Sequence, residues 1–384
     1  MPLLTYEQVQ RFAPLIKIRV ESREMPPWHL DQTIGIQAYK NDISLTQEEI
    51  ETIVDWIDAG TPRGDTADLP SPIEFPKGDS WQAEKVLGRP PDVVFRSTPY
   101  TVLANGQDQW WNPEVDFEGF DETRWLQATE FKPSFPLGKR VVHHGHAFYQ
   151  RPGERESSTP LHLYGVGKIG GDIFEEGTGM RIEPGRAQIS WSLHYFPISD
   201  EAPDNVVEVG LWLYPLGEKP EREVAGEVRF VVDQMQGHPR GADILIPPHG
   251  YQILESAHVV ENPLLIHSFR PHMHMRGSGM SMEAVYPDGR REMLSSVNRY
   301  NHNWQMAYYY EEYAQPLLPQ GTVLLFHAFM DNTANNPINP DPEVWVVRGQ
   351  RGVDEMSHAW VGVTYLDEEE YERLAAERAS ASAR

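Results

Sequence analysis

Residues 263–275 read PLLIHSFRPHMHM, a short apolar segment that predicts a β-strand. Side chains two residues apart in a strand project from the same face of a sheet. His272 and His274 can therefore present two imidazoles to one metal ion without distorting the backbone. The alternative is a pair of histidines that are simply buried in the core or at its rim. Both interpretations place the pair on a strand.

The chain on both sides of this stretch has the same β character. Short segments rich in β-branched and aromatic residues recur from residue 92 onward, separated by turn sequences such as PDGR, PLGE and MDNTANNPINPDP. The 32 prolines and 30 glycines also favour short strands over long helices. This pattern predicts a mainly β fold made of one or two antiparallel β-sandwiches.

The two ends of the chain depart from this pattern. Thr46-x-x-Glu49 has the spacing of a capping box before a helical apolar pattern that stops at Gly60, and an earlier helix is expected near residues 5–20. We therefore expect a helical segment over residues 1–65. A Pro- and Gly-rich linker over 66–91 follows it, and the chain closes with a charged helical tail over 369–384.

Composition excludes several classes of function. The 384 residues carry a formal net charge of −24, which repels nucleic acid and anionic lipid. No apolar run approaches the roughly 20 residues of a membrane span, and the first residues lack the pattern of a signal peptide. The absence of cysteine excludes disulfides, thiol nucleophiles and Cys-ligated zinc.

A second histidine group lies in VVHHGHAFY, residues 141–149. Adjacent strand residues point to opposite faces, so His143 and His144 share a metal only at a strand end or a bulge. His144 and His146 suit a regular strand better, although Gly145 between them could itself mark a bulge. His194 in the aromatic segment SWSLHYFP is a natural third ligand or, taken alone, a core residue.

The donor types restrict the metal. Three imidazoles suit copper or zinc, whereas two imidazoles with a methionine thioether select Cu(I). A zinc hydrolase is disfavoured because no H-E-x-x-H spacing is present.

Five motifs in order, VVHH, LHYFP, RPHMHMRG, DNTANNPINPDP and DEMSHAW, resemble the copper type II, ascorbate-dependent monooxygenases. This family includes the peptidylglycine α-hydroxylating and dopamine β-monooxygenases, and the resemblance is to its bacterial branch and covers nearly the whole chain. It implies two successive, jelly-roll-like antiparallel β-sandwiches, over residues 92–218 and 219–368, that face each other across an open, solvent-filled cleft.

The resemblance also implies the ligands of two copper ions. An electron-donating copper on the first sandwich and a dioxygen-binding copper on the second would be held by His143, His144 and His194, and by His272, His274 and Met356, respectively. His146 stands where the family usually has an aliphatic residue. Arg270, His358 and Trp360 would contact the substrate. His358 and Trp360 replace the Asn and Tyr of the peptide-processing enzyme, so a glycine-extended peptide is not expected.

The implied activity is hydroxylation of an activated C–H bond of a small molecule by O2 and ascorbate or another one-electron donor. The alternative is a non-catalytic copper-binding or electron-transfer protein of the same fold. The family places the protein in the periplasm or outside the cell. The helical segment resembles the bacterial cytochrome c part, with Met25 as axial ligand, but without C-x-x-C-H covalent haem is excluded. We expect the chain to begin after the haem motif; loss of haem is the alternative.

Overall fold

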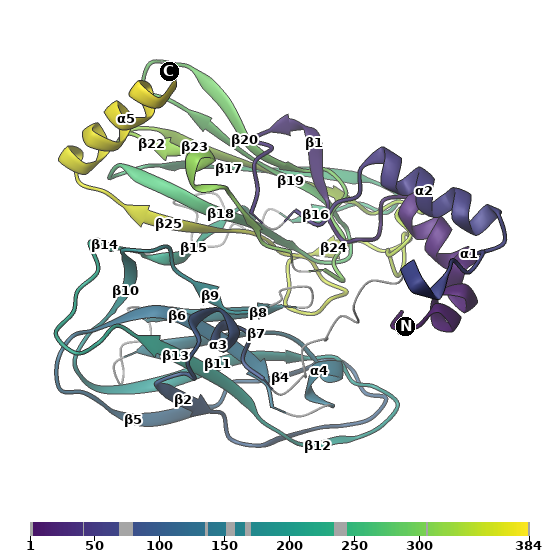
Figure 1. Cartoon of the computed structure of the whole chain (residues 1–384), viewed down its shortest axis with the longest axis horizontal. Coiled ribbons are helices and arrows are strands. Elements are labelled where there is room, and N and C mark those ends of the chain that lie inside the picture. Colours follow the sequence, from purple (N-terminus) through teal and green to yellow (C-terminus); the bar gives the residue numbers. More distant parts are fainter. Residues whose placement is uncertain are drawn as a thin grey trace.

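The computed structural model describes residues 3–40, 42–68, 80–134, 137–150, 158–165, 170–233, 244–304 and 306–382. The N-terminal segment contains helices α1 (Tyr6–Glu21) and α2 (Gln47–Asp58), at one end of the molecule (Figure 1). The predicted capping box is confirmed: the Thr46 hydroxyl accepts from the Glu49 backbone N–H, and the Glu49 carboxylate accepts from the Thr46 N–H.

The first β-sandwich is built from two antiparallel sheets and one short parallel pairing. One sheet has the order β14-β10-β6-β13-β2 with β9 beside β6, and the other has the order β4-β11-β7-β8 with β5 beside β11. Their bounds are β2 (Val93–Arg96), β4 (Gln109–Trp111), β5 (Glu114–Phe120), β6 (Arg124–Pro133), β7 (Val142–Gln150), β8 (Thr159–Gly165), β9 (Asp172–Ile173), β10 (Thr178–Ile182), β11 (Gly185–Tyr195), β13 (Val207–Leu213) and β14 (Arg222–Glu223). A small pair, β3 (Tyr100–Val102) with β12 (Ala202–Asn205), lies at one end.

The second β-sandwich also has two antiparallel sheets, with the orders β1-β20-β19-β23-β17 and β15-β25-β18-β21, the latter with β22 beside β18. Their bounds are β1 (Leu30–Gly35), β15 (Gly226–Val231), β17 (Tyr251–Val259), β18 (Leu264–Met273), β19 (Gly277–Val285), β20 (Arg291–Val297), β21 (Tyr308–Tyr309), β22 (Leu317–Leu318), β23 (Val323–Asp331) and β25 (Ser357–Tyr365). A short pair joins β16 (Leu245–Ile246) to β24 (Val346–Val347). The expected mainly β fold of two successive sandwiches after a helical segment is confirmed.

Tertiary pairing moves three of the expected domain boundaries. The first sandwich extends past residue 218 to Glu223, because β14 pairs with β10. Strand β1 lies inside the expected helical segment but pairs with β20, where Leu30 and Trp28 enter the second core. Helix α3 (Gln82–Leu87), placed by the sequence in the linker, covers the first sandwich, with the Glu130 carboxylate accepting from the backbone N–H of Gln82. Residues 69–79 of that linker lie outside the described residues.

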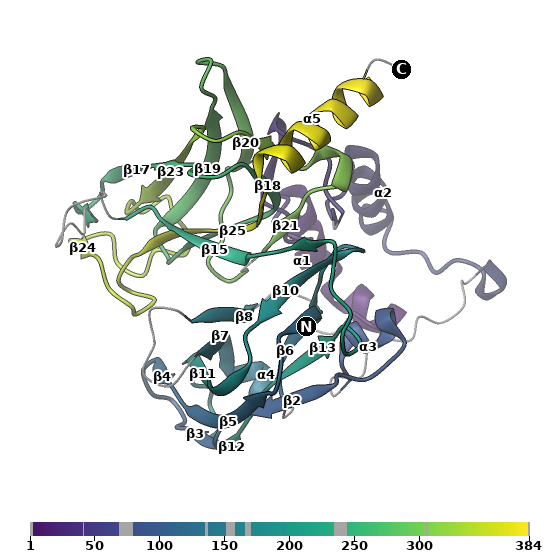
Figure 2. The same ribbon diagram turned by 90° about the vertical axis from the view of Figure 1, so that its left-hand side faces the viewer.

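The two sandwiches meet along a seam. Strands β7, β8 and β10 of the first lie opposite β15, β18 and β25 of the second (Figures 1 and 2). Helix α5 (Glu368–Ser382) runs along the outside of the second sandwich, where Arg378 donates to the Gln315 carbonyl. Among the described residues, no helix combines the length and apolarity needed to cross a membrane.

Candidate metal centre

A β-bulge places the first histidine cluster. Along β7 and β11, His194 pairs with His144 but Tyr195 pairs with Val142, so His143 is the extra residue of the bulge. The bulge lies at the start of β7 and lets two consecutive side chains reach the same neighbour. His194 lies directly across the ladder, and its Nδ1 is 3.1 Å from His144 Nε2.

Ring contacts group His143 with His144 and His194 rather than with His146. The ring of His143 lies 5.4 Å from each of the rings of His144 and His194, and these two rings are 4.8 Å apart. His146 packs instead on Trp360, at 5.0 Å, and on Phe148. Gly145 does not form the bulge. It allows close packing, since a Cβ there would lie 2.8 Å from the Phe131 ring.

The second cluster lies where the last residues of β18 pair with the first residues of β25. His272 is opposite His358 in the ladder, and the ring of His274 is 5.5 Å from that of His272. Met356 immediately precedes β25, and its Sδ lies 3.2 Å from His272 Nε2. His274 Nδ1 lies 3.1 Å from the Asp354 carbonyl oxygen. Because a carbonyl only accepts, Nδ1 carries the hydrogen and Nε2 keeps its lone pair.

A buried carboxylate organises this second cluster. Glu355 is fully buried and accepts from the backbone N–H groups of His274, Arg276 and Met356. Burial raises the pKa of Glu355 to about 8, against the lowering effect of these hydrogen bonds. Glu355 therefore ties the backbone of both ligand-bearing segments to one side chain.

The two clusters touch across the seam, which corrects the expectation of an open, solvent-filled cleft at the histidines. The rings of His144 and His272 are 5.7 Å apart. His302, in the loop after β20, lies between the clusters, with its ring 5.0 Å from His143 and 5.5 Å from His274. Packing of the two inner sheets brings the clusters into direct contact.

Burial favours the neutral form of His143, His144, His194 and His274. It lowers the pKa of His143 to about 2, with His302, His194 and His272 contributing. It also lowers the pKa of His144 and His274 well below the ordinary value. Burial lowers the pKa of His194 as well, although the Asp108 carboxylate, 3.2 Å from its Nε2, acts in the opposite direction. Neutral imidazole is the form that binds a metal.

The donors fit copper in chemistry and pairwise spacing. Within the described residues, no three His, Cys, Asp or Glu side chains already converge as a ready-made metal site. In the first cluster His144 Nε2 and His194 Nδ1 are 3.1 Å apart, and two nitrogens bound to one ion at about 2.0–2.1 Å are separated by about 3 Å. In the second cluster a nitrogen and a sulfur, His272 Nε2 and Met356 Sδ, are 3.2 Å apart. His143 Nε2 and His144 Nδ1 are buried without a hydrogen-bond partner among the described residues. The rings of the third donors, His143 and His274, lie 5.4 Å from the ring of His144 and 5.5 Å from the ring of His272, respectively.

The three expected substrate residues occupy different environments. Trp360 lines a cavity in the seam. Arg270, opposite Trp360 in the ladder, is 1% exposed and its Nη2 donates to Glu227 Oε2. This ion pair engages one nitrogen of the guanidinium, while Arg270 Nε and Nη1 are buried without a hydrogen-bond partner among the described residues. His358 is buried, with its ring 6.1 Å from that of His272, so it packs behind a ligand.

Sequence reasoning missed His302, Glu355 and Asp108. His302 is the single histidine in NRYNHNWQ, so its sequence carries no spacing signal for a metal site. Glu355 was within the quoted motif DEMSHAW, directly before Met356, but its role depends on backbone groups 79 and 81 positions away. Asp108 comes from a loop before β4.

Comparisons with known proteins leave the family open. No protein-family model matches the chain, and no curated protein matches it. Similar solved structures include the PBSX exported protein XepA, with 7% identity and a TM-score of 0.17 over 71% of this chain and 86% of that one. They also include procruciferin, an 11S globulin from Brassica napus, with 10% identity and a TM-score of 0.14 over 72% and 84%. Bacillus subtilis oxalate decarboxylase has 8% identity and a TM-score of 0.13 over 80% and 88%. Likenesses at this level carry no functional argument.

Proposed function

We propose that the chain is a dicopper, ascorbate-dependent monooxygenase that hydroxylates an activated C–H bond of a small organic molecule. The main support is that two different donor sets, three imidazoles on one sandwich and two imidazoles with a thioether on the other, meet at the seam. The ordered motifs that resemble the copper type II monooxygenases agree with this assignment. A protein of this family would reside in the periplasm or outside the cell.

The donor sets suit different tasks. His272, His274 and Met356 would hold one ion with a soft, weak thioether, a set that favours Cu(I). His143, His144 and His194 would hold the other with imidazole alone. When bound, copper supplies the one-electron steps and the dioxygen chemistry of the reaction. One R–H, one O2, two electrons and two protons give R–OH and water, with ascorbate or another one-electron donor as the electron source.

The chain's own residues prepare these sites. The Asp354 carbonyl selects the His274 tautomer that leaves Nε2 as ligand. Glu355 holds the backbone of His274 and Met356 in one arrangement. Burial of the histidines excludes bulk water from the place where the two clusters meet.

Metal content and coordination test the proposal. We would load the metal-free chain with Cu(I), count ions per chain and record X-ray absorption spectra of the wild type, Met356→Ala and His143→Ala. We expect two coppers in the wild type and a sulfur contribution that disappears only in Met356→Ala. Met273→Leu, which removes a buried core thioether, is the matched control. One copper or none, or sulfur that persists in Met356→Ala, contradicts the proposal.

The second candidate is a copper-binding or electron-transfer protein without a substrate. The close contact of the two buried clusters favours it, since direct ring contact suits electron passage. Oxygen uptake driven by ascorbate separates the candidates. A rate that no organic compound increases would identify the non-catalytic protein.

A further inference from the structure

A row of side-chain rings crosses the sheet β4-β11-β7-β8 of the first sandwich. Trp110 in β4 is paired with His194 in β11, and His194 is paired on its other side with His144 in β7. Residues that are directly paired in neighbouring strands project from the same face of the sheet. The three rings therefore lie side by side on one face.

The rings of this row are in contact with one another. The Trp110 indole stacks on the His194 imidazole, with the ring centres 4.7 Å apart and the planes 9° from parallel. The ring centres of His194 and His144 are 4.8 Å apart, and those of His144 and His272 are 5.7 Å apart. Aromatic rings in contact have centres about 4.5–7 Å apart. The row thus leads from Trp110 to both candidate copper sites.

Trp110 is the end of the row that meets solvent. Strand β4 is an edge strand, which among the described residues pairs with β11 alone. The Trp110 side chain is half-buried, and Gln107 in the loop just before β4 is exposed. His194 is only 2% exposed. A molecule in solution can therefore touch the indole, whereas the imidazole beneath it is covered.

The imidazole beneath the indole is oriented by Asp108. Its Nε2 lies 3.2 Å from Asp108 Oδ2, and its Nδ1 lies 3.1 Å from His144 Nε2. A carboxylate beside Nε2 favours the tautomer that carries hydrogen there and keeps the lone pair on Nδ1. The indole consequently stacks on a ring whose lone pair faces the first cluster.

A second half-buried ring also stacks on the first cluster. The Phe196 ring lies 3.9 Å from that of His143. Indole is the more electron-rich of the two rings, as its stronger attraction for cations shows. Electronic contact between a donor and a copper ligand is therefore better through Trp110, and Phe196 provides a matched control.

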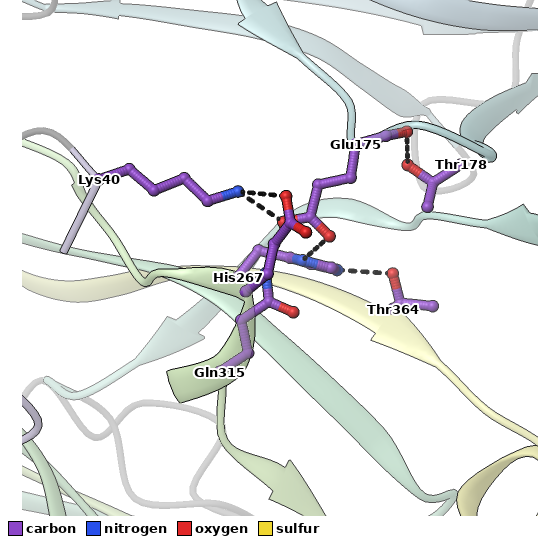
Figure 3. Close-up of polar contacts among 7 residues, drawn as sticks. Lys40, Glu175, Thr178, His267, Gln315 and Thr364 are labelled. Carbon is purple, nitrogen blue, oxygen red and sulfur yellow. Dashed lines mark hydrogen bonds and ion pairs between the residues drawn. The ribbon is translucent and has the colours of Figure 1, made fainter. Parts of the chain in front are cut away.

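The opposite end of the seam is built differently (Figure 3). There Lys40 Nζ lies 2.9 Å from Glu175 Oε1, which also accepts from Gln315 Nε2. These contacts tie the N-terminal segment and the two sandwiches together. The nearby imidazole of His267 comes five positions before His272 in β18, and five residues of a strand span about 16 Å. This end is therefore much farther from the clusters than the indole is.

We propose that electrons from the external donor enter at Trp110, and that the stacked rings of Trp110 and His194 carry each electron to the first cluster. The proposal rests on the proposed function, which supplies the copper and the donor. One ascorbate monoanion loses one electron and one proton to become the monodehydroascorbate radical, and one Cu(II) becomes Cu(I). Two such events supply the two electrons of a hydroxylation, and Trp110 undergoes no net oxidation or reduction.

The rate of copper reduction tests the entry site without any substrate. The Cu(II)-loaded full chain is mixed with ascorbate in the absence of oxygen, and the loss of the Cu(II) signal is followed by rapid-freeze electron paramagnetic resonance. We expect Trp110→Leu to be reduced about tenfold more slowly than the wild type. Trp110→Phe, which keeps a stacked ring, should retain most of the rate. Reduction of Trp110→Leu at the wild-type rate overturns the proposal.

The resting Cu(II) spectrum and the reduction potential of each variant separate an entry site from a structural role. Both should match the wild type in Trp110→Leu, since the ligands themselves are unchanged. A slower rate that accompanies a changed spectrum or potential would make Trp110 a support of the copper site, and would overturn the proposal.

Two other ring deletions are the matched controls. Trp345→Leu removes an indole of the second sandwich that is 59% exposed, and Phe196→Leu removes the other ring stacked on the first cluster. Both variants should be reduced at the wild-type rate. Slowing in Phe196→Leu equal to that in Trp110→Leu would contradict a specific entry at the indole.

A charge placed beside the indole tests the position of entry independently. Gln107→Lys should speed reduction by the ascorbate anion about twofold at low ionic strength, and Gln107→Glu should slow it by a similar factor. Both effects should disappear in high salt. Gln320→Lys, at an exposed position of the second sandwich, changes the net charge equally and should have less effect. Equal effects at the two positions would overturn the proposal.

Copper content and oxygen uptake separate this proposal from the proposed function. Two coppers per chain and oxygen uptake that a substrate increases, with Trp110→Leu reduced at the wild-type rate, would refute the entry site and leave the monooxygenase. Slow reduction of Trp110→Leu in a chain whose oxygen uptake no organic compound increases would refute the monooxygenase and leave the entry site.

Discussion

The two histidine clusters are built by different means. The cluster of His143, His144 and His194 depends on one bulge in a strand ladder, and the partly exposed carboxylate of Asp108 lies beside His194. In the cluster of His272, His274 and Met356, a fully buried carboxylate bonds to the backbone of the ligand-bearing segments. The first is held by strand pairing and the second by a polar network.

This difference teaches where each cluster is vulnerable. A network of buried hydrogen bonds loses several partners at once when its central group is removed. A bulge tolerates changes in side-chain polarity, but it depends on the packing of the strand that carries it. Four predictions, in decreasing order of expected effect, follow from this contrast.

Replacing the central carboxylate should have the largest effect. Glu355→Leu would leave the buried N–H groups of His274, Arg276 and Met356 without their acceptor, and we expect a loss of about 3–5 kcal/mol in the free energy of unfolding. Urea denaturation measures it. Glu355→Gln retains an acceptor oxygen and should lose less, while Asp108→Asn at the first cluster should lose under about 1 kcal/mol. Equal losses for Glu355→Leu and Asp108→Asn would remove the contrast.

A matched pair of glycines probes the packing beneath each cluster. At Gly277 a Cβ would lie 2.5 Å from the Met273 Cβ, and at Gly145 it would lie 2.8 Å from the Phe131 ring and 2.9 Å from Leu193 Cδ2. We expect Gly277→Ala and Gly145→Ala each to cost about 1–3 kcal/mol in urea denaturation. Gly277→Ala should cost more, because a Cβ is anchored to the backbone whereas a leucine methyl group can move. The reverse order would mean that the first sandwich is the more rigid.

His302 belongs to the second sandwich but contacts both clusters. Its Nδ1 lies 3.2 Å from the Met273 carbonyl, which assigns the hydrogen to Nδ1. We expect His302→Phe, which keeps an aromatic ring, to weaken Cu(I) binding about tenfold in a competition titration. Phe196→Leu, which alters another ring packed on His143, is the control and should change it less. Unchanged Cu(I) affinity in His302→Phe would show that this histidine only fills space.

The smallest effect concerns acid stability, tested at two histidines that lie outside the two clusters. Burial lowers the pKa of His29 and of His267 to about 4 from 6.5. Between pH 4 and pH 6.5 the unfolded chain binds more protons at these two histidines than the folded chain does. The stability that the neutral histidines contribute is therefore complete above pH 6.5 and is lost as the pH falls toward 4. The thermal unfolding temperature of His267→Asn should therefore fall less steeply with decreasing pH than that of the wild type over this range. An identical slope in the two proteins would exclude His267 as a contributor.

Local sequence patterns predicted the elements that depend on neighbouring residues. The Thr46–Glu49 capping box and the strand carrying His272 were predictable, because both follow from spacings of a few residues. Strand β1 was missed, since its residues form a strand only by pairing with β20 more than 250 positions later. The choice between His143 and His146 stayed open for the same reason: the bulge is defined by the register of β11 against β7.

The sequence by itself determined the class of fold and the types of donor available: short strands between turns, imidazole and thioether groups, and no thiol. Only the tertiary structure decided that the two clusters touch, that Glu355 supports one of them, and that Arg270 is engaged by Glu227. The physical reason is range. Periodicity and capping act between residues a few positions apart, whereas contacts across the seam depend on how two completed sandwiches pack.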